Sequence, residues 1–513
     1  AGVVVVSLAK NNPIEKSKEA LFKADIIAFR DDLNLSIANE LALTNTLAKE
    51  DIDAAGKDML KYIPSMTKKY IPKLEIQDGS LMYIGTDKKE EKWFNEVLGR
   101  ESAYKVEKPA IKAGLTPIKW NASNAVVTTT DTDAEWSDYQ NKKWANAQTS
   151  DGSMWTWIPR YAYRIIYYDK PVVDNQAPAG GNIVGYSDNR GLVDANEKPS
   201  TAFDRANGRV EVAFLGPNNF KYLNGANYVG DVRKKDKINN PNHYVVHPAF
   251  SAVRRTGYTK KADGNFGNTK EIPGFWVSKF EMGPGSVSKP NIVSQRSMSV
   301  SDMFTLGRNL ATKRGIKDGD SNLMTTTQWG AVAYLAKAIG QEPAINASYS
   351  YTTGGGNYIA NVAQSTTKNV TGVYDMNGCA WETMAAYIED QTNAHNANLT
   401  TKKDTKYVDV YAKGGNPGDR NSNYQANADK YGDAQYEVSS NGVSSPAGWS
   451  DDCSYFPYST YPVFYRGGFF IDGDGAGVFA LFDYSGGPDN FFSWRRSLHF
   501  VTSGTFYLQS VYS

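Results

Sequence analysis

A glycine-punctuated stretch near the C-terminus constrains this chain most. From Phe464 to Leu498 the sequence reads FYRGGFFIDGDGAGVFALFDYSGGPDNFFSWRRSL, in which glycines and recurring residues alternate with aromatic and polar positions. Glycine allows tight turns and close backbone approach. We therefore expect short strands and turns of fixed geometry that carry the intervening side chains outward as a display surface.

The composition limits what this surface can belong to. The 513 residues, 41% of them apolar, can form more than one domain and bury a substantial core. Lysine and arginine total 56 against 55 acidic residues, a formal charge of +1, so no global field attracts nucleic acid or an anionic membrane. Two cysteines and four histidines are too few and too scattered for a zinc cluster or a disulfide scaffold. We therefore expect stability to come from a packed core. We also expect a local surface, rather than the overall charge, to select the partner.

The N-terminus begins with an apolar run, Ala1 to Ala9, and continues into a helical pattern. Nine residues are far fewer than the roughly 20 that span a bilayer. The run either is the end of a helix or forms a strand from Val3 to Val6, because β-branched residues favour strands. A signal peptide is disfavoured, since a basic segment and a small-residue cleavage site are missing. The helical pattern places one apolar stripe at a spacing of three or four: Phe22, Ile26, Phe29, Leu33, Ile37 and Leu41.

The next segment predicts a small α+β unit. Two alternating strands around Asp78-Gly79 are expected between Tyr70 and Gly85, followed by a short helix that ends before Gly99. Charged residues and Pro109 then indicate a boundary. The predicted division is a helical segment 1–56, the small unit 57–110, a strand-rich first part of a large domain 111–270, and a ligand-binding domain 271–513.

Three strings mark the large domain. Gly274 to Glu281 reads GFWVSKFE, Gly372 to Thr383 reads GVYDMNGCAWET, and the C-terminal stretch holds RGG, AGVF and SWRR in that order. Between the first two, Thr325 to Ile339 has N-cap threonines and an alanine- and leucine-rich body, which predicts a helix with Trp329, Val332 and Leu335 on its buried face.

These strings resemble the C-type-lectin-like fold shared by relatives of formylglycine-generating enzyme and by the variable proteins of diversity-generating retroelements. The N-terminal segment resembles that of type IV pilin-like proteins, in which a hydrophobic helix that begins upstream continues into a charged amphipathic helix. The resemblance implies an α+β fold: a pilin-like helix with a small α+β unit, then a large C-type-lectin-like domain rich in short strands and loops.

Catalysis is not expected. The copper-using enzymes of the family need paired cysteines after the RGG motif, and Gly475 to Leu481 contains no sulfur. The iron-dependent relatives use a histidine cluster, which the four histidines, His243, His247, His395 and His499, do not reproduce. We therefore predict no catalytic residue, no cofactor and no metal ligand.

Cysteine usage leaves one question open. Cys379 stands where the family has an asparagine that can take part in a calcium site, and a thiol is a poor ligand for calcium. With Cys453 it forms either one disulfide or a pair of buried free thiols. The polar segment Asn393 to Ser450, with few aliphatic residues, is expected to form surface loops.

The expected binding surface consists of variable-looking positions between the glycines. Adenine-directed mutagenesis of AAC or AAT codons cannot produce Trp, Met, Lys, Gln or Glu, and none of these occurs at the candidates, apart from Trp494 as a fixed aromatic at the edge of the site. Arg466, Val478, Phe479, Arg495 and Leu498 are expected to be buried or hydrogen-bonded. The ligand-binding candidates are Phe469, Phe470, Ile471, Asp472, Asp474, Phe482, Asp483, Tyr484, Ser485, Asp489, Asn490, Phe491, Phe492 and Trp494.

These observations predict an extracellular, cell-surface or pilus-associated adhesin-like protein. Rigid aromatic side chains anchor interfaces at low entropy cost, so the expected partner is a protein or glycan ligand on another cell or surface. Pilin-like subunits are further expected partners. Nucleic acid is not, and a membrane would be reached only through an upstream helix. The alternatives are a phage-derived structural or receptor-binding protein and an enzyme of the formylglycine-generating type.

Overall fold

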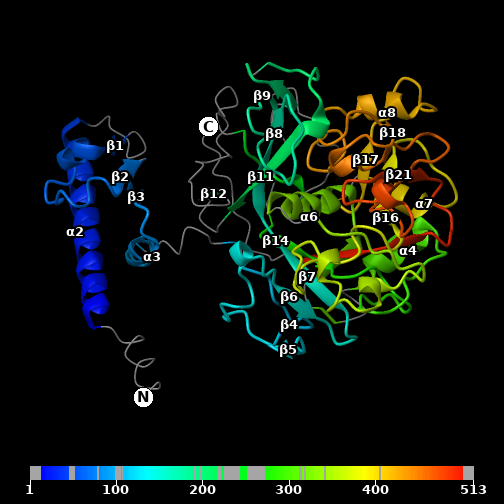
Figure 1. Cartoon of the computed structure of the whole chain (residues 1–513), viewed down its shortest axis with the longest axis horizontal. Helices are drawn as coiled ribbons and strands as arrows, with labels where there is room; N and C mark the ends of the chain where they lie inside the picture. The colour runs from blue at the N-terminus through cyan, green and yellow to red at the C-terminus, as the bar shows by residue number, and fades with distance from the viewer. Residues whose placement is uncertain are drawn as a thin grey trace. The chain divides into compact units, whose positions relative to one another are not determined.

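The computed structural model describes residues 13–44, 52–77, 80–98, 106, 108–188, 191–196, 198–215, 221–223, 243–250, 272–310, 315–316, 319–339, 342–403 and 406–500. The chain forms two compact units, Ala1–Lys105 and Val106–Ser513. Helices and mostly antiparallel sheets occur together, which confirms the α+β class (Figure 1). The expected pilin-like helix end or strand within Ala1–Ala9 lies outside the described residues. Among those described, no helix is both long and apolar enough to cross a membrane.

The small unit combines a long helix with a three-stranded sheet. Strands β2 and β3 pair antiparallel, which confirms the expected hairpin, although its turn at Asp78-Gly79 lies outside the described residues. The carboxylate of Asp87 accepts the backbone N–H groups of Lys89 and Glu90, so it caps the short helix that the sequence predicts. The elements are α2 (Pro13–Thr44), β1 (Ala54–Ala55), β2 (Leu74–Gln77), β3 (Ser80–Tyr83) and α3 (Lys88–Val97).

The apolar stripe of α2 forms the core of this unit. Phe22, Ile26, Phe29, Leu33 and Ile37 are all buried and pack against residues of the sheet and of α3. The rings of Phe22 and Phe29 meet Tyr70 at 5.7 and 5.1 Å. The expected helical stripe is confirmed for these five residues, whereas the side chain of Leu41 lies outside the description.

In the large unit, one seven-stranded sheet joins its beginning to its end. The order is β15-β23-β14-β7-β6-β4-β5, in which β14 opens the GFWVSKFE string and pairs with β23 near the C-terminus. The sheet therefore draws on both predicted segments, 111–270 and 271–513. Its strands are β4 (Thr116–Trp120), β5 (Val126–Thr128), β6 (Asn146–Gln148), β7 (Met154–Pro159), β14 (Gly274–Ser278), β15 (Gly319–Leu323) and β23 (Arg496–Phe500).

Two further sheets complete the large unit. In one, β8 is central and pairs with β9, β11 and β13. In the other, β16 pairs antiparallel with β20 and parallel with β17 and β22. The first contains β8 (Tyr161–Tyr168), β9 (Ile183–Asp188), β10 (Gly191–Asp194), β11 (Gly208–Leu215), β12 (Lys221–Leu223) and β13 (Val245–Val246); the second contains β16 (Trp381–Ile388), β17 (Asp409–Tyr411), β18 (Val443–Ser444), β19 (Ser454–Tyr455), β20 (Val463–Arg466), β21 (Leu481–Tyr484) and β22 (Phe492–Trp494).

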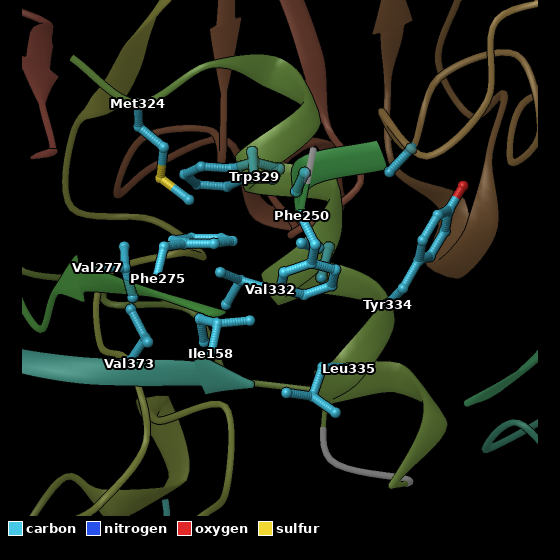
Figure 2. Packing of buried hydrophobic residues seen from close by; sticks show 14 of the residues in the cluster. Ile158, Phe250, Phe275, Val277, Met324, Trp329, Val332, Tyr334, Leu335 and Val373 are labelled. Atoms are coloured by element: carbon cyan, nitrogen blue, oxygen red, sulfur yellow. The ribbon is translucent and has the colours of Figure 1, made fainter. Parts of the chain in front are cut away.

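Helix α6 (Thr326–Ala338) lies in the middle of the large unit and contacts both β11 and β16 (Figure 1). Thr325 and Gln328 form a capping box at its start. The predicted buried face is confirmed: Trp329, Val332 and Leu335 are inaccessible to solvent. Figure 2 shows these side chains among Phe250, Phe275 and Ile158, which come from other segments of the large unit. The remaining helices are α4 (Val300–Arg308), α7 (Ala397–Thr400) and α8 (Arg420–Ala426).

The segment from Asn393 to Ser450 differs from the prediction. Leu399, Tyr424 and Glu437 are buried, and so is most of the run from Lys430 to Ser439. Its polar side chains satisfy backbone groups inside the fold; Asn427, for example, bonds Ala412 and Asn423. The expectation of surface loops is therefore wrong for this part, because internal hydrogen bonds offset the cost of burying polar groups.

Candidate binding face

The residues expected to be buried around the candidate site are buried. Arg466, Val478, Phe479, Arg495 and Leu498 all lie inside the large unit. The side chain of Arg495 donates to the carbonyls of Ser278 and Tyr374, at 2.7 and 2.8 Å, and to the carboxylate of Glu382. One guanidinium thus holds together three strings that are far apart in the sequence.

A first aromatic group forms where the RGG loop meets the loop before β22. The ring of Phe469 lies 5.5 Å from that of Phe470 and 5.4 Å from that of Phe491, and Phe470 meets Tyr351 edge-on at 5.0 Å. We call Tyr351, Phe469, Phe470 and Phe491 the phenylalanine cluster. Within it Phe491 is 47% exposed, and Ile471, which follows Phe470 in the chain, is 67% exposed. These candidates therefore come together at the surface.

Arg296 belongs to the same neighbourhood. Its guanidinium stacks 3.9 Å above the ring of Tyr351, and its Nη1 donates to the carbonyl of Asn490. Ser297 bonds the side chain of Asn490, and its backbone N–H donates to the carbonyl of Asp489. The loop before β22 is therefore fixed against the segment that carries Arg296.

A second aromatic group lies around β21. Phe482 packs on Tyr455 at 5.8 Å, Tyr484 stacks on Tyr461 at 5.5 Å, and Tyr461 meets Tyr458 at 5.4 Å. We call these five residues the tyrosine cluster. All five are half-buried, so their rings contribute to the surface.

Trp381 connects the two clusters. Its ring packs on Phe482 at 5.3 Å. Burial raises the pKa of Asp472, and the nearby indole N–H of Trp381 opposes that rise. The carboxylate of Asp472 accepts the backbone N–H of Phe469 at 2.9 Å. The phenylalanine and tyrosine clusters therefore adjoin, and we refer to both together as the aromatic face.

Three candidates do not lie on this face, and their assignment as ligand contacts is wrong. Asp483, Phe492 and Trp494 are buried. Asp483 points inward from β21, where Arg420 binds its carboxylate at 2.8 and 3.2 Å. Phe492 packs 4.2 Å from Tyr465, and both it and Trp494 lie in β22, which pairs with the buried strand β16. All three residues of β22 are buried, so side chains on both of its faces lie inside the fold.

The remaining candidates have polar roles within the loops. Asp489 accepts the backbone N–H of Phe491 and the hydroxyl of Tyr484, at 3.1 and 3.3 Å. The hydroxyl of Ser485 accepts the N–H of Gly487. Asp474 lies in the turn Gly473–Gly475, but its side chain lies outside the described residues.

Electrostatics on the face depends on two arginines. Burial raises the pKa of Asp483 to about 6, an effect that the guanidinium of Arg420 partly offsets. Arg420 in turn stacks 4.4 Å from the ring of Tyr458. Arg296, in contrast to Arg420, has no carboxylate of a described residue within ion-pair distance.

Sequence reasoning missed part of the face. The run Tyr455 to Tyr461, directly before the RGG loop, is rich in tyrosine, and that enrichment could have identified it. No local enrichment in the sequence identifies Arg296 and Tyr351. Only the tertiary fold brings Tyr351 beside Phe470 and Arg296 beside Tyr351.

The cysteines are two buried free thiols, which settles the alternative left open by the sequence. Burial raises the pKa of Cys379 well above its ordinary value, and it raises that of Cys453 to about 12. In the part of the chain that the structure describes, no group of three or more His, Cys, Asp or Glu side chains is arranged to hold a metal ion.

No protein-family model matches the sequence. No curated protein matches it either.

Proposed function

We propose that this chain is a cell-surface or pilus-associated binding protein that contacts its ligand through the aromatic face. One observation carries the proposal: half-exposed aromatic side chains from the segments 455–461 and 469–484 and from Phe491 adjoin one another above a buried, hydrogen-bonded interior. Tyrosine and arginine are enriched in binding hot spots, and phenylalanine is enriched in interfaces. A rigid support beneath them lowers the entropy cost of binding.

The C-type-lectin-like fold is part of this proposal. Its support is the pairing of β14 with β23, which closes the region from Gly274 onward on itself, and the hydrogen bonds of Arg495 to three separated strings. Such closure gives loops a firm base from which variable side chains can project.

The pilin-like assignment of the N-terminal part is supported by a second apolar face on α2. Ile14, Leu21 and Leu35 share one side of the helix at intervals of seven or fourteen residues, and all three are largely exposed. They lie opposite the stripe that packs inside the small unit. We infer that this outer face packs against pilin-like subunits.

Ligand screening tests the proposed function. The full chain is screened against a printed glycan array and a displayed library of random peptides, and each binder is measured again with Phe491→Ala and Ile471→Ala. Each change should weaken binding by about 1–2 kcal/mol, roughly 5- to 30-fold, without loss of stability. Val173→Ala is the control, because Val173 is an exposed apolar residue outside the face. Binders that respond to none of the face variants would refute the assignment.

Gene neighbourhood provides an independent test of origin. A reverse transcriptase gene beside this one would support retroelement diversification, and pilus assembly genes would support surface display. Phage tail genes, or a sulfatase gene, would instead favour the alternatives given above.

A further inference from the structure

Arg296 is held in one orientation on the aromatic face. The central carbon of its guanidinium lies 3.9 Å from the centre of the Tyr351 ring, and its Nη1 donates to the carbonyl of Asn490. Tyr351 itself is buried against Phe470. The arginine is therefore preorganised, so little side-chain entropy would be lost when a ligand binds it.

This cation differs from the other half-buried arginines that the structure describes in the large unit. Arg164, Arg209, Arg308 and Arg420 each bind a carboxylate of this chain, at 2.7 to 2.8 Å. Arg296 binds none among the described residues, and its Nε, shielded from solvent, has no acceptor. A planar guanidinium pairs best with a carboxylate, in a fork of two hydrogen bonds. The face thus contains a cation that lacks its preferred partner.

The nearby acids do not serve as that partner. Asp472 accepts the backbone N–H of Phe469 at 2.9 Å. Asp489 accepts from Phe491 and Tyr484, and the side-chain oxygen of Asn490 accepts from Ser297. The polar side chains around Arg296 are therefore engaged within the chain itself.

The rest of the exposed surface here is apolar. Ile471 and Phe491 project from the loops, and Tyr349, two residues before Tyr351, is 79% exposed. A glycan presents many hydroxyl groups that need hydrogen-bonding partners, and the side chains named above are already engaged. An apolar surface with one unpaired arginine instead complements a protein segment.

We propose that Arg296 recognises an aspartate or glutamate of a protein ligand, while Ile471 and Phe491 contact apolar side chains next to that acid. This inference rests on the proposed function, and it specifies the chemistry of the partner. The carboxylate would form a forked ion pair with the guanidinium, enclosed by the surrounding rings and so shielded from salt more than an exposed pair.

The test uses the displayed random-peptide library, with the full chain as bait. Peptides selected by the wild-type chain should be enriched in Asp or Glu beside Leu, Ile or Phe. Synthetic copies of them should bind Arg296→Gln about 10- to 100-fold more weakly, the loss expected when one member of a close charge pair is removed. Arg296→Lys, which retains the charge without the planar fork, should recover part of the affinity. Lys403→Gln, which removes an exposed cation, should change nothing.

The outcomes separate this inference from the function on which it rests. Peptides that need Phe491 and Ile471 but lack acids, or that bind Arg296→Gln as well as wild type, would overturn the role of Arg296 and leave the aromatic face as the binding site. Binding of acidic glycans alone, or no peptide binder, would also overturn it. Binders insensitive to every face variant would contradict the proposed function itself. Circular dichroism of Arg296→Gln and Arg296→Lys checks that both remain folded.

Discussion

The hydroxyl of Tyr163 donates to the carboxylate of Glu437 across the core of the large unit, 2.9 and 3.1 Å from its two oxygens. Tyr334 and Ser187 donate to the same carboxylate, at 2.8 and 2.6 Å. The polar segment that contains Glu437 is thereby attached to β8, β9 and α6. A carboxylate with these donors can be buried because hydrogen bonds replace its water.

Glu437 should make the stability of the large unit depend on pH. Burial raises its pKa from 4.5 to about 7, although the hydrogen bond from Ser187 acts in the opposite direction. Between these two values the folded chain binds more protons than the unfolded chain. The contribution of Glu437 to the free energy of unfolding should therefore be fully present below about pH 4.5 and be lost as the pH rises through about 7, by an amount on the order of 3 kcal/mol.

Urea unfolding at pH 5 and pH 8 measures this effect. Only Trp93 of the eleven tryptophans precedes the large unit, so tryptophan fluorescence follows that unit. Glu437→Gln should reduce the difference in the free energy of unfolding between pH 5 and pH 8. Glu135→Gln, an exposed control, should leave that difference unchanged. Parallel pH profiles for wild type and Glu437→Gln would show that another group is responsible.

Arg495 and Glu382 form an ion pair that is fully excluded from solvent. Arg495→Met should destabilise the large unit by about 3–5 kcal/mol, because it leaves the carboxylate buried and two carbonyls without their donor. Lys413→Met, which breaks an exposed pair with Asp390, should cost less than about 1 kcal/mol. Denaturant titration compares the two variants. If both variants lost the same free energy of unfolding, the Arg495–Glu382 pair would contribute no more to stability than an exposed ion pair.

Local patterns predicted those elements whose structure depends on neighbours in the sequence. The stripe of α2, the β2–β3 hairpin, and the threonine N-cap and buried face of α6 all follow from spacing and from residues at the ends of elements.

Long-range contacts could not be predicted in this way. β22 pairs in parallel with β16, more than 100 residues earlier, and this pairing buries Phe492 and Trp494. Composition also suggested an exposed segment around Glu437, because it does not reveal which polar side chains find internal partners. The candidate positions that stayed at the surface lie in the loops on either side of β21, and at Phe482 and Tyr484 on the outer side of β21 itself.

The cysteines should be unreactive in the folded protein. Burial raises the pKa of both thiols, and the thiolate is the form that attacks disulfide reagents and binds copper(I). We expect almost no reaction with DTNB at pH 8, two thiols after unfolding in urea, and no stoichiometric uptake of copper. Copper binding that disappears in Cys379→Ser would bring back the enzyme hypothesis.

Natural variation should follow exposure rather than position in the sequence. If the C-terminal stretch is diversified, closely related chains should differ at 469–472, 482, 484, 485 and 489–491, and should retain Asp483, Phe492 and Trp494, since changes at buried sites destabilise. Sequencing this gene across related isolates provides the measurement. Differences spread evenly over the stretch, or frequent at Asp483, would contradict diversification of a binding face.

The two faces of α2 should respond differently to the same substitution. Leu33 lies in the core of the small unit, whereas Leu35, two positions later, is 62% exposed. Leu33→Asp buries a charge and should unfold the small unit, while Leu35→Asp should change its stability by no more than about 0.5 kcal/mol. Thermal unfolding followed by the loss of helical circular dichroism distinguishes these effects.

Pilus assembly should be sensitive to Leu35→Asp, although that change leaves the small unit folded. If the outer face of α2 packs against pilin-like subunits, Leu35→Asp leaves a folded chain that no longer enters the pilus, because the acid places a charge in an apolar helix contact. Immunogold labelling of pili in the producing cell measures incorporation, and Asn34→Asp, which adds the same charge beside that face, is the matched control. Normal incorporation of Leu35→Asp would remove the outer face of α2 from the assembly contacts and with it the support for the pilin-like assignment.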